Sequence, residues 1–356
     1  MAFRAAAGYA NLPNGNFSPI IYSKKVQTAF RKASVVEDIT NNDYFGEIAN
    51  FGDTVRIIKE PEISVQEYSR GTQIVPQELD DEDFTLVVDQ ANYFAFKIDD
   101  IEEAHSHINF ESLATDRAGY RLRDQYDQEI FGYMAGFKQS ALHANADTAR
   151  VAGDKSGTDP ISTVDADGLL NSMKLTSTDM GIGSTTANSI PITATPTSTN
   201  SSALAVLNRM ARRLDQQNVD RDGRWLVVDP VFAEVLNDEN SKLLNNDFAG
   251  RQDAGDILRN GRIMDGLIRG FRIYMSNNLP TLGTGPGTVA AAGSSSNFGV
   301  IIAGHDSAVA TASQIEKVET YRDNDSFADV VRGLHMYGRK LLRPEALVTA
   351  AYNLHS

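Results

Sequence analysis

Cysteine is absent from this 356-residue chain, so disulfide scaffolds, cysteine-ligated zinc and thiol catalysis are excluded. No apolar run approaches the roughly 20 residues that span a bilayer, and the N-terminal stretch MAFRAAAGYANLPNGNF lacks the apolar core of a secretion signal. Basic residues are outnumbered, with 33 Lys and Arg against 47 Asp and Glu and a formal net charge of −14. We therefore expect a chain made in the cytoplasm, without a membrane span. Any surface of it that touches nucleic acid must be locally basic.

Catalytic and metal-binding motifs are also missing from the sequence. None of the six histidines lies in a nucleophile or metal motif, and no GxSxG elbow occurs. His105 and His107 are two residues apart and would diverge on a helix, while the acidic run from Glu78 to Asp83 is typical of a solvated turn. The segment GTGPGT has Thr288 where a dinucleotide motif needs its third glycine. We expect no catalytic residue, no cofactor and no metal, with a soluble α/β enzyme as an alternative.

The stretch NVDRDGRWLVVDP nearly spells a calcium loop, because Asn218, Asp220 and Asp222 alternate and Asp229 falls at the twelfth position. The final third of such a loop has to enter a helix, yet RWLVV is an apolar, largely β-branched run typical of a buried strand. Asp229 precedes Pro230, and this pair suits an N-cap followed by the first residue of a helix. The favoured interpretation is a turn, a buried strand and a capped helix, with calcium binding as the alternative.

The first half of the chain changes character several times. Residues 1–50 contain segments rich in proline, glycine and asparagine, such as NLPNGNFSP, which interrupt regular secondary structure. Three segments then have the composition of strands and predict a long hairpin: DTVRIIK, FTLVVDQ and YFAFKID. From about residue 112 to 144, apolar side chains recur every four residues, which predicts one helix of about 45–50 Å at about 1.5 Å per residue. The apolar stripe of this helix is Leu122, Tyr126, Ile130 and Met134.

The second half begins with residues 172–202, which are rich in Ser and Thr and predict a long loop or an insertion. A helical segment follows, SALAVLNRMARRLDQQN, and then three strand-like segments, RWLVV, GLIRGFRIYMSNNLP and NFGVIIAG. This mixture of helix and strands predicts an α/β or α+β layer. The last part, SFADVVRGLHMYGRKLLRPEALVTAAYNL, predicts a strand pair with Gly333 and Gly338 as bends.

The chain resembles the major capsid protein of tailed bacteriophages, which has the Hong Kong ninety-seven type of fold. The similarity lies in the order of the parts: an arm, a hairpin, a long helix, an α/β domain and returning strands. The resemblance is carried by YSKKVQTAFRKASVVEDITNNDYFGEIANFGDTVRI, RWLVVDPVFAEVLND, GLIRGFRIYMSNNLP and HDSAVATASQIEKVETYRDNDSFADVVRGLHMYGRKLLRPEAL. It implies an α+β fold with these parts: an N-terminal arm at 1–50, an extended hairpin loop at 51–100, a peripheral domain with a spine helix at 101–160, an axial domain at 161–321 that includes the Ser/Thr-rich segment, and strands at 322–356 that return to the peripheral domain.

The resemblance also implies a function. Such a chain assembles with itself, as pentamers and hexamers, into a procapsid and then a mature icosahedral head that encloses double-stranded DNA through weak, non-specific contact only. Too little precedes the arm for a fused scaffolding region, so a separate scaffolding protein is implied, together with a portal protein and a possible decoration or cement protein. The hairpin would touch a neighbouring subunit at a tip formed by Tyr68, Arg70, Gly71 and Thr72. An encapsulin-like nanocompartment shares the fold and is the main alternative.

Overall fold

The structure, a computed structural model, describes much of the chain, and every structural statement below refers to those residues. Within them, no helix is long and apolar enough to cross a membrane. The described residues are 35–41, 54–58, 63, 65, 67–68, 70–71, 73, 76–77, 83–88, 90–99, 110–135, 170–182, 189–193, 200–236, 268–282, 298–323 and 328–354.

Three long antiparallel strands form what we call the peripheral sheet. Its order is β10 (Val309–Arg322), β11 (Ala328–Leu341) and β3 (Gln90–Asp99). A bulge between Ser313 and Ile315 interrupts the register of β10 with β11. Although FTLVVDQ and YFAFKID lie close together in the sequence, only the first belongs to the hairpin, because β3 pairs with β11 along its whole length. Residues 90–99 of the predicted hairpin loop at 51–100 thus lie in the peripheral sheet.

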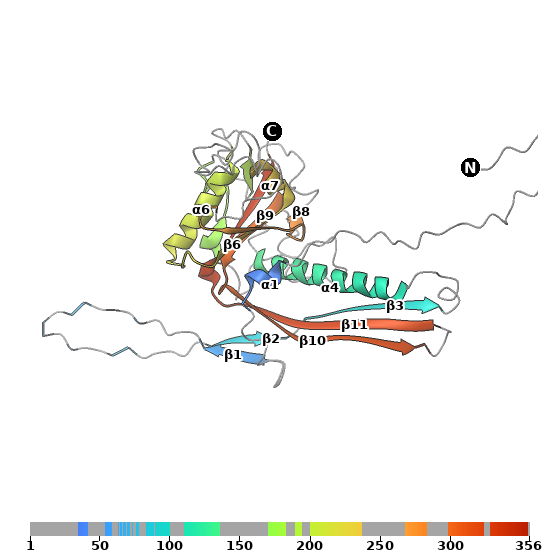
Figure 1. Cartoon of the computed structure of the whole chain (residues 1–356). Coiled ribbons are helices and arrows are strands. Elements are labelled where there is room, and N and C mark those ends of the chain that lie inside the picture. The colour runs from blue at the N-terminus through green and yellow to red at the C-terminus, as the bar shows by residue number, and fades with distance from the viewer. Residues whose placement is uncertain are drawn as a thin grey trace, which may run out of the picture.

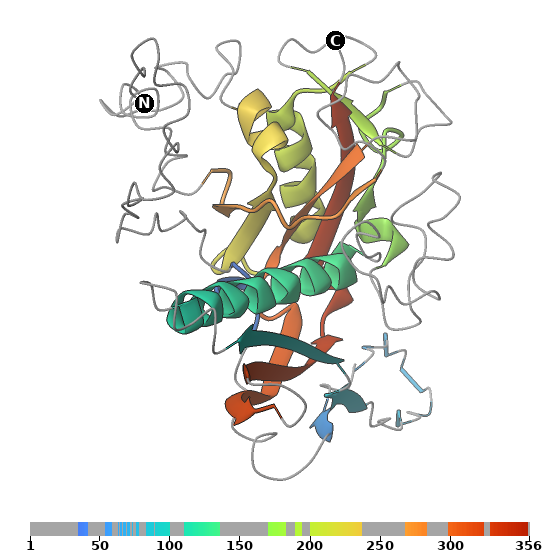
Figure 2. The same cartoon turned by 90° about the vertical axis from the view of Figure 1, so that its right-hand side faces the viewer.

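The long helix α4 (Phe110–Ala135) runs between the peripheral strands and the rest of the molecule (Figures 1 and 2). It begins two residues before the predicted start, and residues 136–144 of the expected helix lie outside the described part. Tyr126, Ile130 and Met134 are buried as the apolar stripe predicts, while Leu122 is half-buried. The four-residue spacing therefore identified the packed face of the helix.

A second, mixed sheet, which we call the axial sheet, has the order β4-β12-β9-β6-β7, with β5 beside β12 and β8 beside β9. The helices α6 (Ala203–Gln216) and α7 (Pro230–Leu236) accompany it. All five residues of β6 are buried, so the predicted RWLVV strand is confirmed. The strands are β4 (Lys174–Leu175), β5 (Ile190–Ile192), β6 (Arg224–Val228), β7 (Arg272–Met275), β8 (Thr281–Leu282), β9 (Phe298–His305) and β12 (Leu347–Leu354).

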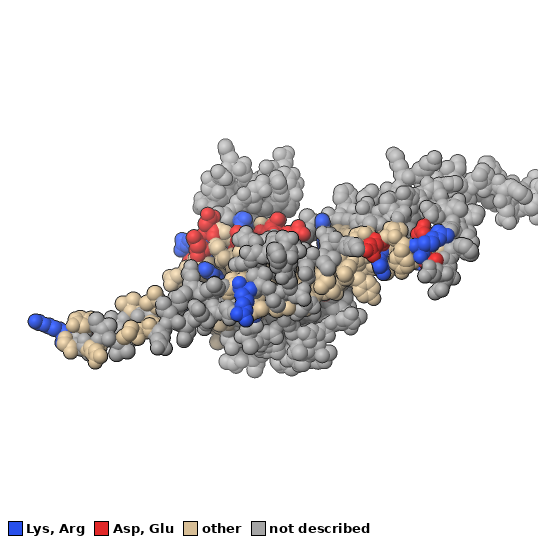
Figure 3. Space-filling view, turned by 90° about the horizontal axis from the view of Figure 1, so that it is seen from below, with Lys and Arg blue, Asp and Glu red and all other residues tan. Residues whose placement is uncertain are grey.

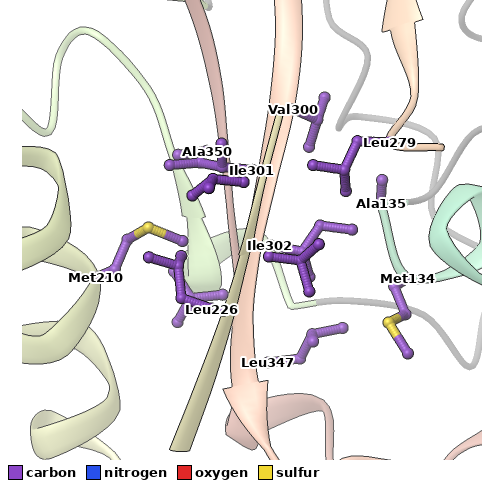
Figure 4. Close-up of a cluster of buried hydrophobic side chains, with 14 of the residues drawn as sticks. Met134, Ala135, Met210, Leu226, Leu279, Val300, Ile301, Ile302, Leu347 and Ala350 are labelled. Atoms are coloured by element: carbon purple, nitrogen blue, oxygen red, sulfur yellow. The ribbon is translucent and has the colours of Figure 1, made fainter. Parts of the chain in front are cut away.

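The main hydrophobic core lies on both faces of the axial sheet. Side chains of β9 alternate across the sheet, so Ile301 points toward Met210 of α6 while Ile302 points toward Met134 of α4 (Figure 4). These residues are fully or almost fully buried. The C-terminal end of the long helix is thus part of the axial core and connects the two sheets.

Two neighbouring connections pass between the sheets. One joins β9 to β10, and the other joins β11 to β12 through the short 3₁₀ helix η4 (Pro344–Ala346). They are bonded to each other, since the carbonyl of Ala308 accepts from the amides of Leu342 at 2.9 Å and Arg343 at 3.2 Å.

The predicted boundary at residue 321 does not follow these sheets. Strand β10 lies in the peripheral sheet although it falls within the predicted axial domain of 161–321. Conversely, β12 lies in the axial sheet although residues 322–356 were expected to return to the peripheral domain. The chain crosses between the two sheets twice, at the tight turns that join β9 to β10 and β11 to β12, so neither sheet is formed by one continuous segment.

The Ser/Thr-rich segment at 172–202 is not simply a loop or insertion. It contributes β4 and β5, which pair in parallel with β12, and continues from the 3₁₀ helix η2 (Asn171–Met173). Ile190 and Ile192 are fully buried, and Ser202 caps α6 by accepting from the Ala205 amide at 3.2 Å. Two apolar residues are enough to add a short strand at the edge of an existing sheet, which composition alone could not indicate.

The predicted N-terminal arm at 1–50 is described only at residues 35–41, and these do not extend from the body. The short helix α1 (Val36–Ile39) buries Val36 and Ile39 completely. Asn41 then pairs with Ala310 at the start of β10. This part of the predicted arm is therefore core structure.

Candidate assembly surfaces

A two-stranded hairpin projects from the molecule on the side of β10 (Figure 1). Its base is β1 (Thr54–Ile58) paired antiparallel with β2 (Asp83–Val87). Every described residue between the two strands, from 63 to 77, is exposed. The apolar side chains Ile63, Val65 and Tyr68 are 70%, 96% and 64% exposed, so the described part of this segment, which we call the hairpin arm, forms no core of its own.

The predicted tip residues lie in the hairpin arm. Arg70 and Gly71 form a turn, and the φ of +93° at Gly71 is a backbone conformation that residues with a Cβ atom rarely adopt. Tyr68 and Arg70 are exposed beside it, and no atom lies within 4 Å of where a Gly71 Cβ would stand. Thr72 lies outside the described residues. The tip therefore presents an aromatic ring and a cation without an intramolecular partner among the described residues.

The base of the hairpin is fixed to the peripheral sheet by a small core of Leu86, Val88, Ala310 and Ala312. Gly338 of β11 makes this approach possible, because a Cβ there would collide with the carbonyl oxygen of Val87. Gly338 is therefore a point of close backbone contact inside a continuous strand, and the bend predicted at this position is wrong. The arm extends from an anchored base.

The face of the peripheral sheet that carries the hairpin base has exposed apolar side chains farther along. Tyr93 stands opposite Leu334, and they are 78% and 37% exposed. Tyr321 is 45% exposed, with the guanidinium of Arg332 4.9 Å from its ring centre. We call this surface the lower sheet face. Sequence reasoning missed it, because β3 carries apolar residues on both faces in the run Tyr93–Phe96, so no polar–apolar alternation marks which face is exposed.

Charges on the lower sheet face and at the far end of the peripheral sheet are neutralised within the chain. The ion pairs are Lys97–Asp323 at 2.6 Å, Arg322–Asp329 at 3.3 Å and Arg332–Glu319 at 2.8 Å. Figure 3, seen from below, shows cationic and anionic side chains side by side at this end of the molecule. An apolar surface with paired charges around it has the composition of a protein-binding surface.

The opposite face of the peripheral sheet is joined to α4 through buried polar groups. Tyr337 donates to a carboxylate oxygen of Glu129, and Arg339 donates to the Glu129 carbonyl at 3.1 Å. The Arg339 guanidinium also lies 5.0 Å from the ring centre of Tyr133. Burial raises the pKa of the adjacent Tyr126 to about 12. No sequence motif signals this network; a glutamate inside the apolar stripe was the available hint.

Asp229 stands before α7, with Pro230 as the first helical residue. One carboxylate oxygen accepts from the Phe232 amide at 3.1 Å, which is an N-cap bond, and the same oxygen accepts from the buried hydroxyl of Tyr352. Burial raises the pKa of Asp229, and these two hydrogen bonds oppose the shift. Burial and the nearby carboxylate raise the pKa of Tyr352 as well.

The calcium-like stretch forms a turn. The Asp222 amide donates to the Asp220 carboxylate at 3.3 Å, and the Gly223 amide donates to the Asp222 carboxylate at 3.1 Å. Arg224 is almost fully buried and pairs with Asp215 at 2.8 Å. The pKa of Asp215 is lowered: burial acts against the shift, and the bonds from Arg224 and Arg221 outweigh it. Across the described residues, no group of three or more potential ligands could hold a metal ion.

Comparison with known proteins identifies the family. A family model described as phage capsid protein matches residues 81–350, which is most of the chain, and the chain belongs to this family. No curated protein matches it. A solved structure from Mycobacterium phage Che8 is 26% identical with a TM-score of 0.68, and the match covers 94% of this chain and 97% of that one.

Two further capsid structures share the fold at lower identity. The capsid of the cyanophage P-SCSP1u is 19% identical with a TM-score of 0.61, covering 97% of each chain. The capsid of Ralstonia phage GP4 is 12% identical with a TM-score of 0.62, covering 99% of this chain and 98% of that one. The protein is thus a structural protein with the Hong Kong ninety-seven type of fold. It is a major capsid protein that forms a phage shell, and the encapsulin and enzyme alternatives are not favoured.

Proposed function

We propose that the hairpin arm contacts a neighbouring subunit in an icosahedral shell built of pentamers and hexamers. The observation that carries this proposal is the exposure of Ile63, Val65 and Tyr68 on a segment that has no core of its own among the described residues. Ordering such a segment costs about 1–2 kcal/mol per residue in backbone entropy. Burial against a second subunit offsets that cost, and none of the described residues of the same chain covers Ile63, Val65 or Tyr68.

The shell first forms, in this proposal, as a procapsid around a separate scaffolding protein, and a portal protein occupies one vertex. Assembly takes place in the host cytoplasm, and the finished head holds double-stranded DNA. The chain carries no catalytic role. The match to a phage capsid family supports the assembly of a head, and the lack of a catalytic motif in the sequence supports a purely structural role.

Co-expression of the chain with a candidate scaffolding protein from the same phage tests the proposal. Sedimentation and electron microscopy are expected to show closed particles with five-fold and six-fold clusters of subunits. A single species at the 38.8 kDa monomer mass under every assembly condition would contradict the proposal.

A further inference from the structure

The chain passes between the axial and the peripheral sheet at two neighbouring connections, which together we call the joint. They are the connections from β9 to β10 and from β11 to β12, bonded to each other through the carbonyl of Ala308. A third segment, residues 35–41, also lies at the joint, next to α4 (Figure 1). We call this segment the strap. Its hydrogen bonds join positions 92 and 271 residues apart, so it ties distant parts of the chain together.

One end of the strap is bonded to the first residues of β10, directly after the chain has left the axial sheet. The Asn41 amide donates to the Val309 carbonyl at 2.9 Å, and the Thr311 amide donates to the Asn41 carbonyl at 3.1 Å. The hydroxyls of Thr40 and Thr311 are also hydrogen-bonded, at 2.9 Å, and both side chains are buried. Val309 follows Ala308, where the two connections meet. The strap is therefore bonded to the joint itself.

The other end of the strap is fixed to α4 and to the axial core. The Val35 amide donates to a carboxylate oxygen of Asp127 at 3.2 Å, and Asp127 is only 2% exposed. Val36 and Ile39 are fully buried in the same hydrophobic core as the axial strands. One segment of seven residues thus contacts the long helix, the axial core and the first strand of the peripheral sheet.

Few side chains hold the strap in place. Of its seven residues only Val36, Ile39 and Thr40 are buried, whereas β9 buries seven of its eight residues. Segments with few buried contacts open locally at a lower free energy than core strands do. The surface under the strap includes the Asp127 carboxylate and the Thr311 hydroxyl, polar groups that water solvates well. These features favour release of the strap while both sheets stay folded.

We propose that the strap holds the joint in one geometry, and that its release allows the peripheral sheet to turn relative to the axial sheet. While the strap is in place, Thr40 and Asn41 keep the start of β10 at a fixed position beside α4. After release, the two connections and the C-terminal end of α4 hold the sheets together. This inference goes beyond the proposed function, because it concerns a single subunit. Its consequence for a shell, which rests on the proposed function, is that the strap sets the curvature each subunit contributes.

The first test fixes the strap covalently in the full-length chain, which has no native cysteine to interfere. The variant is T40C/T311C, because the two threonine oxygens lie 2.9 Å apart and sulfur atoms in their places need only a small shift to reach the bond length of about 2.05 Å. Hydrogen exchange is compared between the oxidised and the reduced form. Amides at positions 309–312 and 342–343 are expected to exchange about tenfold more slowly in the oxidised form. Equal exchange in both forms, or failure of the disulfide to form, overturns the inference.

The second test loosens the strap with V36A/I39A. The matched control is V206A/I301A, which removes the same atoms from fully buried positions on the α6 side of the axial sheet. Both variants lose stability, so the measured quantity is the exchange rate at positions 309–312 relative to that at 225–228 in β6. This ratio is expected to rise about tenfold in the strap variant and to stay at the wild-type value in the control. The same ratio in both variants would mean that the strap contributes only to general stability.

Turning of the sheets is measured directly with a pair of spin labels. The labels are attached through N208C on the exposed side of α6 and A95C on the exposed side of β3. In the V36A/I39A background the distance distribution between the labels is expected to broaden or shift, while the control background keeps the wild-type distribution. An unchanged distribution in the strap variant would refute turning at the joint.

Assembly with a candidate scaffolding protein separates this inference from the proposed function. Wild type and V206A/I301A are expected to form particles of one diameter, and V36A/I39A particles of a wider range of diameters or no closed particles. If wild type forms no particles, the proposed function fails and the measurements on single subunits still decide this inference. If the strap variant forms particles as uniform as those of wild type, the strap does not set the curvature of the shell.

Discussion

At the residue scale, Asp229 combines two demands that oppose each other. A carboxylate is an excellent cap for α7, yet the side chain is only 5% exposed, and burial disfavours its charge. Burial raises its folded-state pKa above the ordinary value, so the folded protein binds this proton more tightly than the unfolded chain does. Its contribution to stability is therefore largest below the ordinary pKa and is lost as pH rises through the raised, folded-state value.

We expect Asp229→Asn to preserve folding and to gain stability relative to wild type as pH rises from 4 to 7. Asn caps helices as well as Asp and can accept from the Tyr352 hydroxyl, without a buried charge. Asp229→Ala is expected to cost about 2–3 kcal/mol, because the cap is lost and a buried hydroxyl is left without its acceptor. Urea denaturation at several pH values measures both. A stability difference between Asn and Asp that does not change with pH would contradict the assignment.

Asp222 lies in a stretch whose sequence resembles a calcium-binding loop but which forms a turn in the structure. Its carboxylate bonds the next amide in an exposed turn. Asp222→Ala should therefore leave the melting temperature within about 1 °C in calcium and in chelator alike, as expected for an exposed position. Titration calorimetry gives the independent check, since a stoichiometric heat of calcium binding in wild type that the variant loses would restore the metal interpretation.

At the scale of single elements, replacing glycine by alanine is expected to change stability in opposite directions at two positions. Gly338 lies where β11 meets the backbone of Val87, and Gly119 lies on the exposed side of α4 with no atom within 4 Å of an added Cβ. Gly338→Ala should cost about 1–3 kcal/mol, because the hairpin base has to move. Gly119→Ala should stabilise by up to about 1 kcal/mol, through helix propensity alone.

Hydrogen exchange distinguishes a local loosening of the hairpin base from a general loss of stability. Gly338→Ala is expected to increase exchange at residues 84–88 more than at β9 in the axial core. Uniform acceleration across both regions would mean that the contact with Val87 does not hold the hairpin base.

Elements with a strong local signal were predicted correctly from the sequence. The RWLVV strand and the apolar stripe of α4 are examples, because periodicity and β-branching report directly on burial. Strand partners were not predictable in the same way. β3 follows β2 after two residues yet pairs with β11, whose residues are 229 to 247 positions away, and this choice depends on which surface the finished strand can cover. Of the candidate assembly surfaces, the turn at Arg70 and Gly71 could be predicted from its glycine, whereas the lower sheet face depends on which strands pair and could not be predicted from the sequence.

At the scale of the whole molecule, the hairpin arm separates folding from assembly. The last pair of the hairpin base is Ile58 with Asp83, and Leu86 and Val88 hold that base on the peripheral sheet. Replacement of residues 59–82 by Asn-Gly closes the strands with a two-residue turn that suits a β-hairpin. The subunit should fold cooperatively with a melting temperature close to wild type, because the described residues of the arm are exposed.

The same variant is expected to form no shells, or shells that dissociate on dilution. Each arm contributes only a modest contact, but a closed shell repeats it around every subunit, so many weak contacts hold together. Arg70→Glu at the tip should weaken assembly less and in a salt-dependent manner, since an exposed ion pair is screened. Arg212→Glu, on the exposed side of α6, is the charge-matched control. Scanning calorimetry of subunits and microscopy of assembly reactions measure these effects. If the deletion variant is unfolded, the arm belongs to an intramolecular core. If the deletion variant forms normal shells, the arm is not a contact between subunits.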